Sequence, residues 1–227
     1  LIYSNIFIMS KKGNTLLEQY DDEHKIEVGL DEAGRGCLFG PVCIASVIWP
    51  KKDPENAMVI KDSKKCTEKY REKCYEYIIN NAVAYSIQLM DHNYIDKHNI
   101  LKSTLDGMHL CLDNVSKEDV EIDTILVDGN HFKQYYCSKK DDYIYHKCIV
   151  KGDDKYKSIA AASILAKTYR DNYIKELVKN NPELEKYELQ KNKGYGTKKH
   201  LEALNEYGVT EWHRKTFSPC KEIIQKK

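Results

Sequence analysis

The sequence contains no run of about 18–20 apolar residues, the length that crosses a bilayer as a helix. Its apolar opening, residues 1–9, also lacks the basic start and the small-residue cleavage site of a secretory signal. These absences argue against a membrane protein or an exported protein and favour the cytoplasm. Two interpretations of the opening remain: Met9 is the natural start, or the segment is an N-terminal arm of the domain.

A strong charge of one sign is also lacking, because 36 Lys and Arg residues against 35 Asp and Glu residues leave a net charge of +1. A nucleic-acid partner would therefore have to bind a local basic patch rather than a surface that is basic throughout. Hydrophobic residues make up 41% of the 227 residues, which is enough for a globular core. The length fits one domain with room for a small appendage.

The sequence lacks the closely spaced cysteine and histidine pairs that bind zinc. None of the eight cysteines forms a C-x-x-C pair, and the eight histidines show no metal-ligand spacing, so a zinc site is disfavoured. The even cysteine count could indicate disulfides. Because the chain is long enough to fold without them and shows no export signal, we expect reduced thiols.

Hydrophobic periodicity predicts alternating strands and helices along most of the chain. We expect strands over 26–31, 42–49, 83–89, 122–127 and 145–150, and helices over 64–80, 95–115, 158–178 and 198–207. This order indicates an α/β domain with a mixed β-sheet.

The chain shows no internal repeat and no low-complexity linker. We expect one main domain over residues 25–220, preceded by an N-terminal arm over 1–24 and followed by a polar tail over 221–227 that frays.

Three of the expected strands end in acidic residues, at Asp31-Glu32, at Asp128 and near Asp153. Strand ends at one edge of an α/β sheet are where ligands gather. Four carboxylates meeting there would repel one another unless cations lie between them, and oxygen ligands favour magnesium or manganese. Such a cluster suits two-metal phosphodiester hydrolysis, with the ions about 4 Å apart. Each acid alone has an ordinary alternative as a helix cap or a turn residue, as in Asp128-Gly129.

The local sequence around these acids resembles the ribonuclease HII family. The blocks that carry the resemblance follow the family's order from about residue 26 to 219, and they are VGLDEAGRG (28–36), GPV (40–42), DSK (62–64), LVDG (126–129), KGD (151–153), IAAASILAK (159–167), RD (170–171), KGYGT (193–197) and HR (213–214).

The resemblance implies a ribonuclease H-like mixed sheet flanked by helices, with a helical C-terminal extension. It implies that Asp31, Glu32, Asp128 and Asp153 are the catalytic metal ligands for two Mn²⁺ or Mg²⁺ ions. Asp154 directly follows this set, and we expect it to be a solvated acid at the start of the next helix, where the helix dipole favours it.

The activity implied is hydrolysis of RNA in RNA–DNA hybrids and at single ribonucleotides embedded in duplex DNA, leaving 5′-phosphate and 3′-hydroxyl ends. The alternative is a catalytically inactive hybrid-binding protein of the same fold, against which the presence of all four matched acids weighs. We expect a monomer. No C-terminal clamp-binding motif is evident, so a replication-clamp partner is not expected.

Two glycines close to the first acids suggest how the substrate is recognised. In a regular strand, Asp31 and Glu32 would point to opposite faces, so the chain must turn at once for both to reach one metal pair. Gly34 and Gly36 allow such a turn and leave the backbone bare. Bare amides can contact a ribose 2′-hydroxyl, and the resemblance gives this role to Gly34, Arg35 and Gly36.

A local basic cluster surrounds a glycine-flanked tyrosine at residues 191–200, with lysines at 191, 193, 198 and 199. It is either a solvated face or a loop that binds a phosphate backbone. The resemblance favours the second interpretation. It implies that Tyr195 stacks on a sugar beside the RNA-to-DNA junction, with Lys193 and Lys64 near the substrate.

Three further side chains inside the blocks carry narrower expectations. We expect Ser163 to be a packing residue within an alanine-rich helix. Arg170 and Asp171 are expected to form an ion pair, within the helix or in tertiary contacts. Phe39 replaces a small residue that is common in the family, and it is expected to pack under the glycine turn or to alter substrate access.

Overall fold

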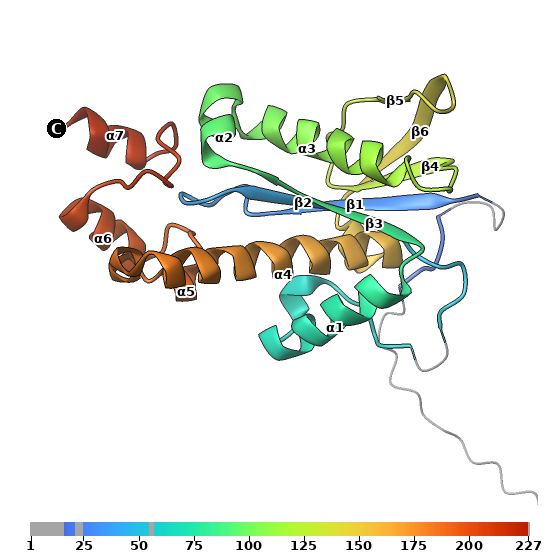
Figure 1. Ribbon diagram of the computed structural model, residues 1–227, viewed down its shortest axis with the longest axis horizontal. Helices are drawn as coiled ribbons and strands as arrows, with labels where there is room; N and C mark the ends of the chain where they lie inside the picture. Colours follow the sequence, from blue (N-terminus) through green and yellow to red (C-terminus); the bar gives the residue numbers. More distant parts are fainter. Residues whose placement is uncertain (1–15, 21–24, 55–56, 227) are drawn as a thin grey trace, which may run out of the picture.

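The computed structural model describes residues 16–20, 25–54 and 57–226 (Figure 1). Both interpretations of residues 1–9 lie outside this part of the chain. Within it, none of the helices combines the length and the apolar character needed to cross a membrane.

A mixed sheet of six strands in the order β3-β2-β1-β4-β6-β5 forms the centre of the fold. The strands are β1 (Glu27–Ala33), β2 (Val42–Ile48), β3 (Ala84–Met90), β4 (Thr124–Asp128), β5 (Tyr135–Cys137) and β6 (Asp142–Ile149). Strand β1 pairs antiparallel with β2 and parallel with β4, and β4 pairs parallel with β6. The predicted α/β class with a mixed sheet is therefore confirmed.

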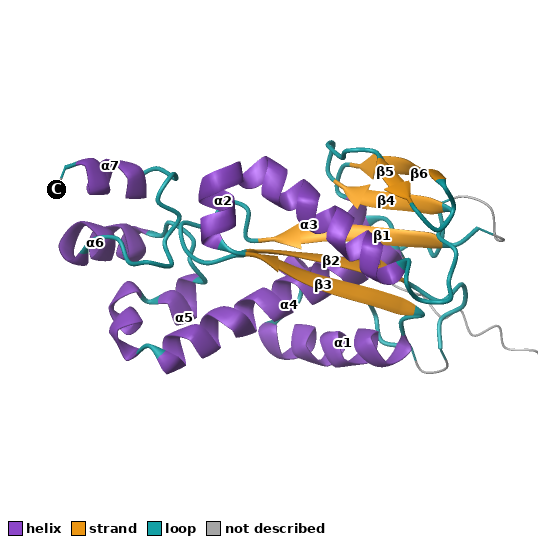
Figure 2. Ribbon diagram, turned by 45° about the horizontal axis from the view of Figure 1, so that its top comes forward, coloured by secondary structure: helices purple, strands orange, loops and turns teal. Residues whose placement is uncertain are grey.

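Helices cover both faces of this sheet (Figures 1 and 2). One face carries α2 (His92–His98) and α3 (Ile100–Val115), and the other carries α1 (Glu68–Asn81) and α4 (Lys157–Asn180). The first core lies between the sheet and α3, where Leu30 and Ile44 pack with Leu112. The second contains the consecutive alanines 160–162 of α4, which pack beside Ala45 and Val47 of β2.

Helix α4 lies unusually close to β1. A side chain on Gly29 would meet the backbone of Ser158 at 2.3 Å, so only glycine fits at this crossing. Gly34, at the other end of the strand, lies against Arg170 of the same helix. Helix and strand therefore run side by side in the same direction, and α4 supplies residues to the edge where β1 ends.

A helical C-terminal layer follows α4 and lies beyond one end of the sheet (Figure 1). It contains the 3₁₀ segment Pro182–Tyr187, α5 (Leu189–Asn192), α6 (Lys198–Tyr207) and α7 (Cys220–Gln225). Its own core includes Phe39, Ile174 and Leu204. The fraying that was predicted after Cys220 is wrong for Cys220–Gln225, because Ile223 packs against this core and holds a short helix.

Several element boundaries differ from the predictions. The helix predicted over 95–115 is two helices, because Asn99 has a φ of 66° and its side chain accepts a hydrogen bond from the Lys102 amide at 3.0 Å. The helix predicted from residue 64 begins at Glu68, after the Thr67 N-cap and a 3₁₀ turn over Ser63–Lys65. The strand predicted from residue 145 begins at Asp142, where β6 pairs with the short strand β5.

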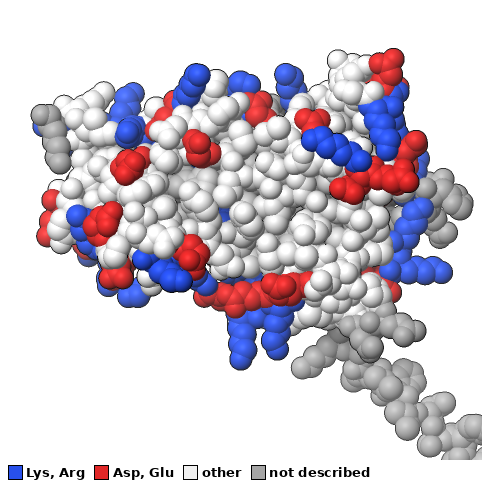
Figure 3. Space-filling view, viewed as in Figure 1, with Lys and Arg blue, Asp and Glu red and all other residues white. Residues whose placement is uncertain are grey.

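Acidic and basic side chains are interspersed on the face shown in Figure 3, and no large area of one sign is visible there. This distribution agrees with the net charge of +1.

Candidate active site

Three acidic side chains converge at one edge of the sheet. Asp31 lies in β1, Asp128 ends β4, and Asp153 lies in the 3₁₀ turn Gly152–Asp154 that follows β6. Because β1 and β4 are adjacent and parallel, with Leu30 opposite Val127, their acids reach the same edge. Carboxylate oxygens of the three residues lie within 4.8 Å of one another, a separation suited to shared cations.

The backbone around the turn orients the last two of these acids. Lys151 takes a left-handed conformation with a φ of 56°, which turns the chain from β6 into the 3₁₀ segment. The Gly152 amide then donates a hydrogen bond of 2.7 Å to Asp128 Oδ1. Asp154 points elsewhere and pairs with Lys65, as expected for an acid outside the site.

Burial and mutual repulsion make this cluster unfavourable as a set of bare anions. Burial, followed by the charges of Glu32 and Asp128, raises the pKa of Asp31 well above its usual value. Burial and the Asp128 charge also raise the pKa of Asp153, although Lys64 Nζ lies 3.5 Å from its Oδ2. Bound cations would relieve this repulsion and restore the ionised forms.

Glu32 lies beside this trio but not within it. Its carboxylate pairs with Arg35 Nη1 at 3.2 Å, and burial raises its pKa while Arg35 opposes the rise. The turn after the acids also comes later than predicted, because Ala33 still pairs with Cys43 and the strand continues past Glu32. The structure therefore brings three of the four expected ligands together and leaves the fourth at the rim.

A pocket beside the acids contains most of the predicted substrate-binding residues. Its lining is Asp31, Glu32, Ala33, Gly34, Arg35, Gly36, Ser63, Lys64, Ser163, Lys167 and Tyr195. Tyr195 is 41% exposed as a residue, and Lys167 Nζ lies 5.8 Å from the centroid of its ring.

Lys193 does not line this pocket. Its side chain lies in a separate groove with Glu68 and Lys175, and its backbone carbonyl accepts a hydrogen bond of 2.8 Å from Arg170. The neighbouring lysines of the predicted cluster are partly neutralised, since Lys199 pairs with Glu188 at 3.2 Å.

Ser163 has a second role beyond packing. It is buried in α4 as predicted, but its hydroxyl lies 2.9 Å from the Ser63 hydroxyl and its hydrogen bond to Asp31 opposes the rise of that acid's pKa. The signal that could have identified it is the helical spacing of Ser163 and Lys167, which places both polar side chains on the face of α4 toward the pocket.

The expected pairing of Arg170 with Asp171 is wrong. Asp171 instead accepts from Arg71 at 3.2 Å and from Lys167 at 2.7 Å. Arg170 donates to backbone carbonyls, including that of Phe39 at 2.9 Å. Phe39 is fully buried in the C-terminal core, edge-on to the His213 ring, so it supports the loop rather than entering the pocket.

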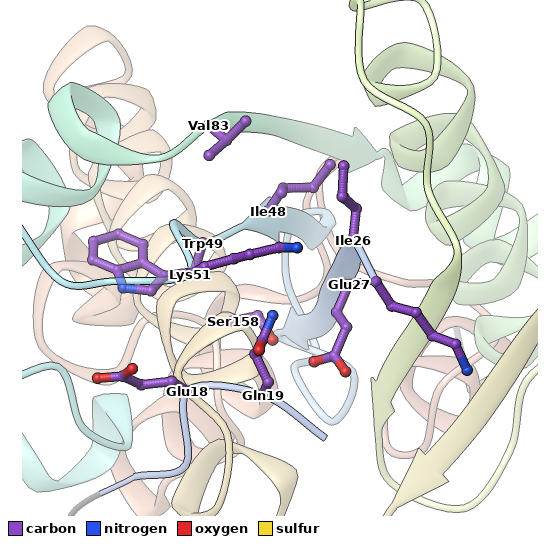
Figure 4. A pocket seen from close by; sticks show the side chains of 10 residues that line it. Glu18, Gln19, Ile26, Glu27, Ile48, Trp49, Lys51, Val83 and Ser158 are labelled. Atoms are coloured by element: carbon purple, nitrogen blue, oxygen red, sulfur yellow. The ribbon is translucent and has the colours of Figure 1, made fainter. Parts of the chain in front are cut away.

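A different pocket lies at the opposite end of β1, where Figure 4 shows Glu18, Trp49 and Ser158 around it. None of the predicted site residues lines it. The segment over residues 16–20 contributes Glu18 and Gln19 to its lining. This segment is held in place because Leu17 pairs with Tyr156 and Glu18 forms an ion pair of 3.1 Å with Lys157. We assign it no part in the chemistry at the acids.

Comparisons with known proteins agree with this geometry. Residues 28–220 match the family model described as Ribonuclease HII. A protein named Ribonuclease HII from Cytophaga hutchinsonii is 44% identical over 201 residues, covering 88% of this chain and 93% of its own.

Two solved structures share the fold. The ribonuclease H2 of Pyrococcus horikoshii superposes with a TM-score of 0.71 at 25% identity, covering 88% of this chain and 97% of its own. The ribonuclease HII of Archaeoglobus fulgidus, solved as a complex with PCNA, superposes with a TM-score of 0.64 at 24% identity, covering 83% of this chain and 92% of its own. The ribonuclease H-like sheet and the helical C-terminal layer are thereby confirmed. With a family match over most of its length, the chain belongs to the ribonuclease HII family.

Proposed function

We propose that the acidic site cleaves the phosphodiester bond at a ribonucleotide held within a duplex, both in RNA–DNA hybrids and at single ribonucleotides embedded in DNA. As a member of the ribonuclease HII family, the chain is a metal-dependent endoribonuclease. The observation that carries the proposal is the convergence of Asp31, Asp128 and Asp153 beside a pocket lined by bare glycine backbone. The products expected are 5′-phosphate and 3′-hydroxyl ends.

The residues fit a pair of divalent cations. All the donors are carboxylate oxygens, the kind of ligand that Mg²⁺ and Mn²⁺ prefer. We propose that Asp31, Asp128 and Asp153 hold the ions and that Glu32 joins them by leaving Arg35. When bound, such ions activate a water molecule and stabilise the leaving oxygen. These acids supply the negative charge that would hold the ions at the sheet edge.

The remaining residues of the pocket position the substrate. Gly34, Arg35 and Gly36 present backbone to the ribose, where a hydrogen bond to the 2′-hydroxyl distinguishes RNA from DNA. Tyr195 presents its ring to the neighbouring sugar. Lys64 and Lys167, both lining the pocket, supply positive charge toward the phosphate backbone. Lys193 approaches the duplex from the adjacent groove.

The wider expectations remain proposals. We propose that the main domain spans residues 25–220, that the chain acts as a monomer on duplex substrates, and that it works in the cytoplasm. All eight cysteines are free thiols in the structure, which supports a reducing compartment. The Archaeoglobus relative was solved as a complex with PCNA. For this chain we propose no replication-clamp partner, because its sequence shows no evident C-terminal clamp-binding motif.

The proposal is tested on a duplex that carries one ribonucleotide, with the cut mapped to the nucleotide in Mg²⁺ and in Mn²⁺. The matched controls are an all-DNA duplex and two neighbouring variants, Asp153→Asn and Asp154→Asn. We expect cleavage beside the ribonucleotide by the wild type and by Asp154→Asn, and none by Asp153→Asn. Equal cutting of the all-DNA duplex would contradict the substrate class. Folded wild-type protein that binds the duplex without cutting it would favour the inactive hybrid-binding alternative.

A further inference from the structure

Two arginines are fully buried in contact with the substrate-binding loops, and neither forms an ion pair with an acid in the described part of the chain. Arg170 and Arg214 are both 0% exposed, which is unusual for arginine outside an ion pair. In the described part of the chain, the hydrogen bonds of their guanidinium groups all end on backbone carbonyls. They therefore act on the path of the backbone.

Arg214 holds the Gly34-Arg35-Gly36 turn from its inner side. Its Nη2 donates to Gly34 O at 2.8 Å, its Nη1 to Arg35 O at 2.8 Å and its Nε to Gly40 O at 3.0 Å. Arg170 lies on the neighbouring side and joins Phe39, Pro41 and Lys193 through their carbonyls. One guanidinium thus fixes two consecutive peptide units of the turn.

The geometry of the peptide bond determines where the amides on the other side of the turn point. In a planar trans peptide, the C=O and N–H bonds point in opposite directions. Since the Gly34 and Arg35 carbonyls point at Arg214, the amides of Arg35 and Gly36 point away from it. Arg35 and Gly36 line the pocket beside the acids, whereas Arg214 does not.

These two amides are available for a ligand. Within residues 16–20, 25–54 and 57–226, neither amide donates a hydrogen bond to another group of the protein. A Cβ on Gly36 would meet nothing within 4 Å, so the space in front of this backbone is open. A pair of outward amides next to open space fits an oxygen acceptor such as a ribose hydroxyl.

Arginine suits this inner position better than any other side chain. Its planar fork supplies several donors in fixed geometry, whereas a lysine ammonium lacks that geometry. Burial lowers the pKa of Arg214 to about 10, which leaves it charged at neutral pH. The charge makes each carbonyl contact stronger than a neutral hydrogen bond, and this offsets part of the cost of burial.

We propose that Arg214 is a positioning residue for ribose recognition: by fixing the Gly34 and Arg35 carbonyls inward, it aims the Arg35 and Gly36 amides at the 2′-hydroxyl. The inference rests on the proposed function, because it assigns a cause to the preference for a ribonucleotide. Arg214 does not line the pocket, and its hydrogen bonds end on the backbone of the turn and of Gly40, so its effect should fall on discrimination between sugars rather than on duplex binding in general.

The test compares affinities for two uncleaved duplexes in Ca²⁺, identical except that one carries a single ribonucleotide and the other is all DNA. The proteins are wild type, Arg214→Lys and Leu204→Ala. Leu204 is buried in the apolar core of the C-terminal layer and has no polar side-chain atom to hold the turn, so it controls for lost stability. We expect Arg214→Lys to reduce the ribonucleotide preference by about tenfold, the loss of roughly one well-aligned hydrogen bond, and Leu204→Ala to leave it unchanged. Cleavage of the one-ribonucleotide duplex in Mg²⁺ should fall in parallel.

Arg214→Ala with added methylguanidinium gives an independent readout, because the small cation can occupy the vacated site and restore the preference. If Arg214→Lys keeps the wild-type preference, the proposal is overturned, whatever its melting temperature. The proposal is also overturned if neither Arg214 variant folds, because Arg214 would then be needed for folding of the core in general. If the wild type itself shows no ribonucleotide preference, the proposed function fails first, and the two failures are thereby distinguishable.

Discussion

Asp31 and Asp128 lie side by side at the ends of two parallel strands, because the register of β1 and β4 places Leu30 opposite Val127. The sheet therefore holds two like charges together, one on the buried Asp31 and one on the half-buried Asp128. The hydrogen bonds of the strands stabilise this arrangement, while the charges oppose it. Removal of either charge should therefore raise the stability of the metal-free fold while it lowers the cleavage rate.

We expect Asp31→Asn to reduce cleavage by roughly 10²–10³-fold or more, as removal of an electrostatic catalytic group does. The same change should raise the free energy of unfolding without metal at pH 7, because the raised pKa means that the charged form destabilises the native state. Each unit of such a shift corresponds to about 1.4 kcal/mol. Cleavage rates and urea denaturation of the metal-free protein check both parts. Near-wild-type turnover would remove Asp31 from the catalytic residues.

Divalent cations should raise the melting temperature of the wild type, with Mn²⁺ more effective than Mg²⁺. Binding to the native state alone adds about 2.7 kcal/mol when the free metal is about a hundredfold above its Kd. Differential scanning fluorimetry with each metal measures the shift, and Asp153→Asn should lose most of it. An identical shift in Asp153→Asn would show that the metal binds elsewhere.

Tyr195→Ala should lose cleavage at a single ribonucleotide far more than it loses duplex affinity. Lysine contacts to phosphates persist in the variant, while stacking worth about 1–3 kcal/mol is removed. Misplacing the reacting phosphate by about 1 Å can cost roughly a hundredfold in rate. Tyr195→Phe keeps the ring and should be the milder change. If alanine leaves the rate unchanged, Tyr195 is a structural residue and Arg35 becomes the next candidate for recognition of the junction.

Acid should destabilise the fold through the buried pair His200 and His213, whose Nε2 atoms lie 3.1 Å apart. The Thr210 amide donates to His213 Nδ1 at 3.0 Å, which requires that nitrogen to be unprotonated. Burial and the neighbouring His200 charge lower the pKa of His213 from 6.5 to about 3. The unfolded chain therefore takes up a proton first, and stability present above pH 6.5 is lost as the pH falls toward 3.

The slope is about 1.4 kcal/mol per pH unit for each proton taken up only by the unfolded state. Denaturant unfolding of the wild type and His213→Gln between these pH values measures it, and we expect a shallower dependence in the variant. His131→Gln is the matched control, because it removes an exposed histidine and leaves the pair intact. Parallel curves for the wild type and His213→Gln would contradict this assignment.

The positions of the acids could be predicted from the sequence because each lies in a short local block. The distinction between Asp153 and Asp154 depends on the left-handed Lys151 and the turn at Gly152, which are adjacent in the chain. The contact of Ser163 with Ser63 was not predicted, because the two residues are 100 positions apart. The role of Arg214 is still less accessible, since its contacts to Arg35 and Gly34 span 179 and 180 residues.

The same limit applies to the fold. Periodicity predicts that residues around 95–115 are helical, but the break at Asn99 depends on a capping contact that competes with a continuous helix. Polar composition after residue 220 predicts a tail, whereas Ile223 finds an apolar partner in a core built from distant segments. A local cap that hydrophobic periodicity does not register decided the first case. Tertiary packing decided the second, and local sequence does not encode it.

The distance along the chain between the acids and Arg214 has a consequence for biosynthesis. During synthesis, all three converging acids have been added once the chain reaches Asp153. Arg214, whose side chain binds the carbonyls of Gly34 and Arg35, is added 61 residues later, at position 214 against position 153. A nascent or prematurely terminated chain of intermediate length therefore contains the acids without the residue that organises the turn. We therefore expect the turn to acquire its final shape only when the C-terminal layer that contains Arg214 has been synthesised.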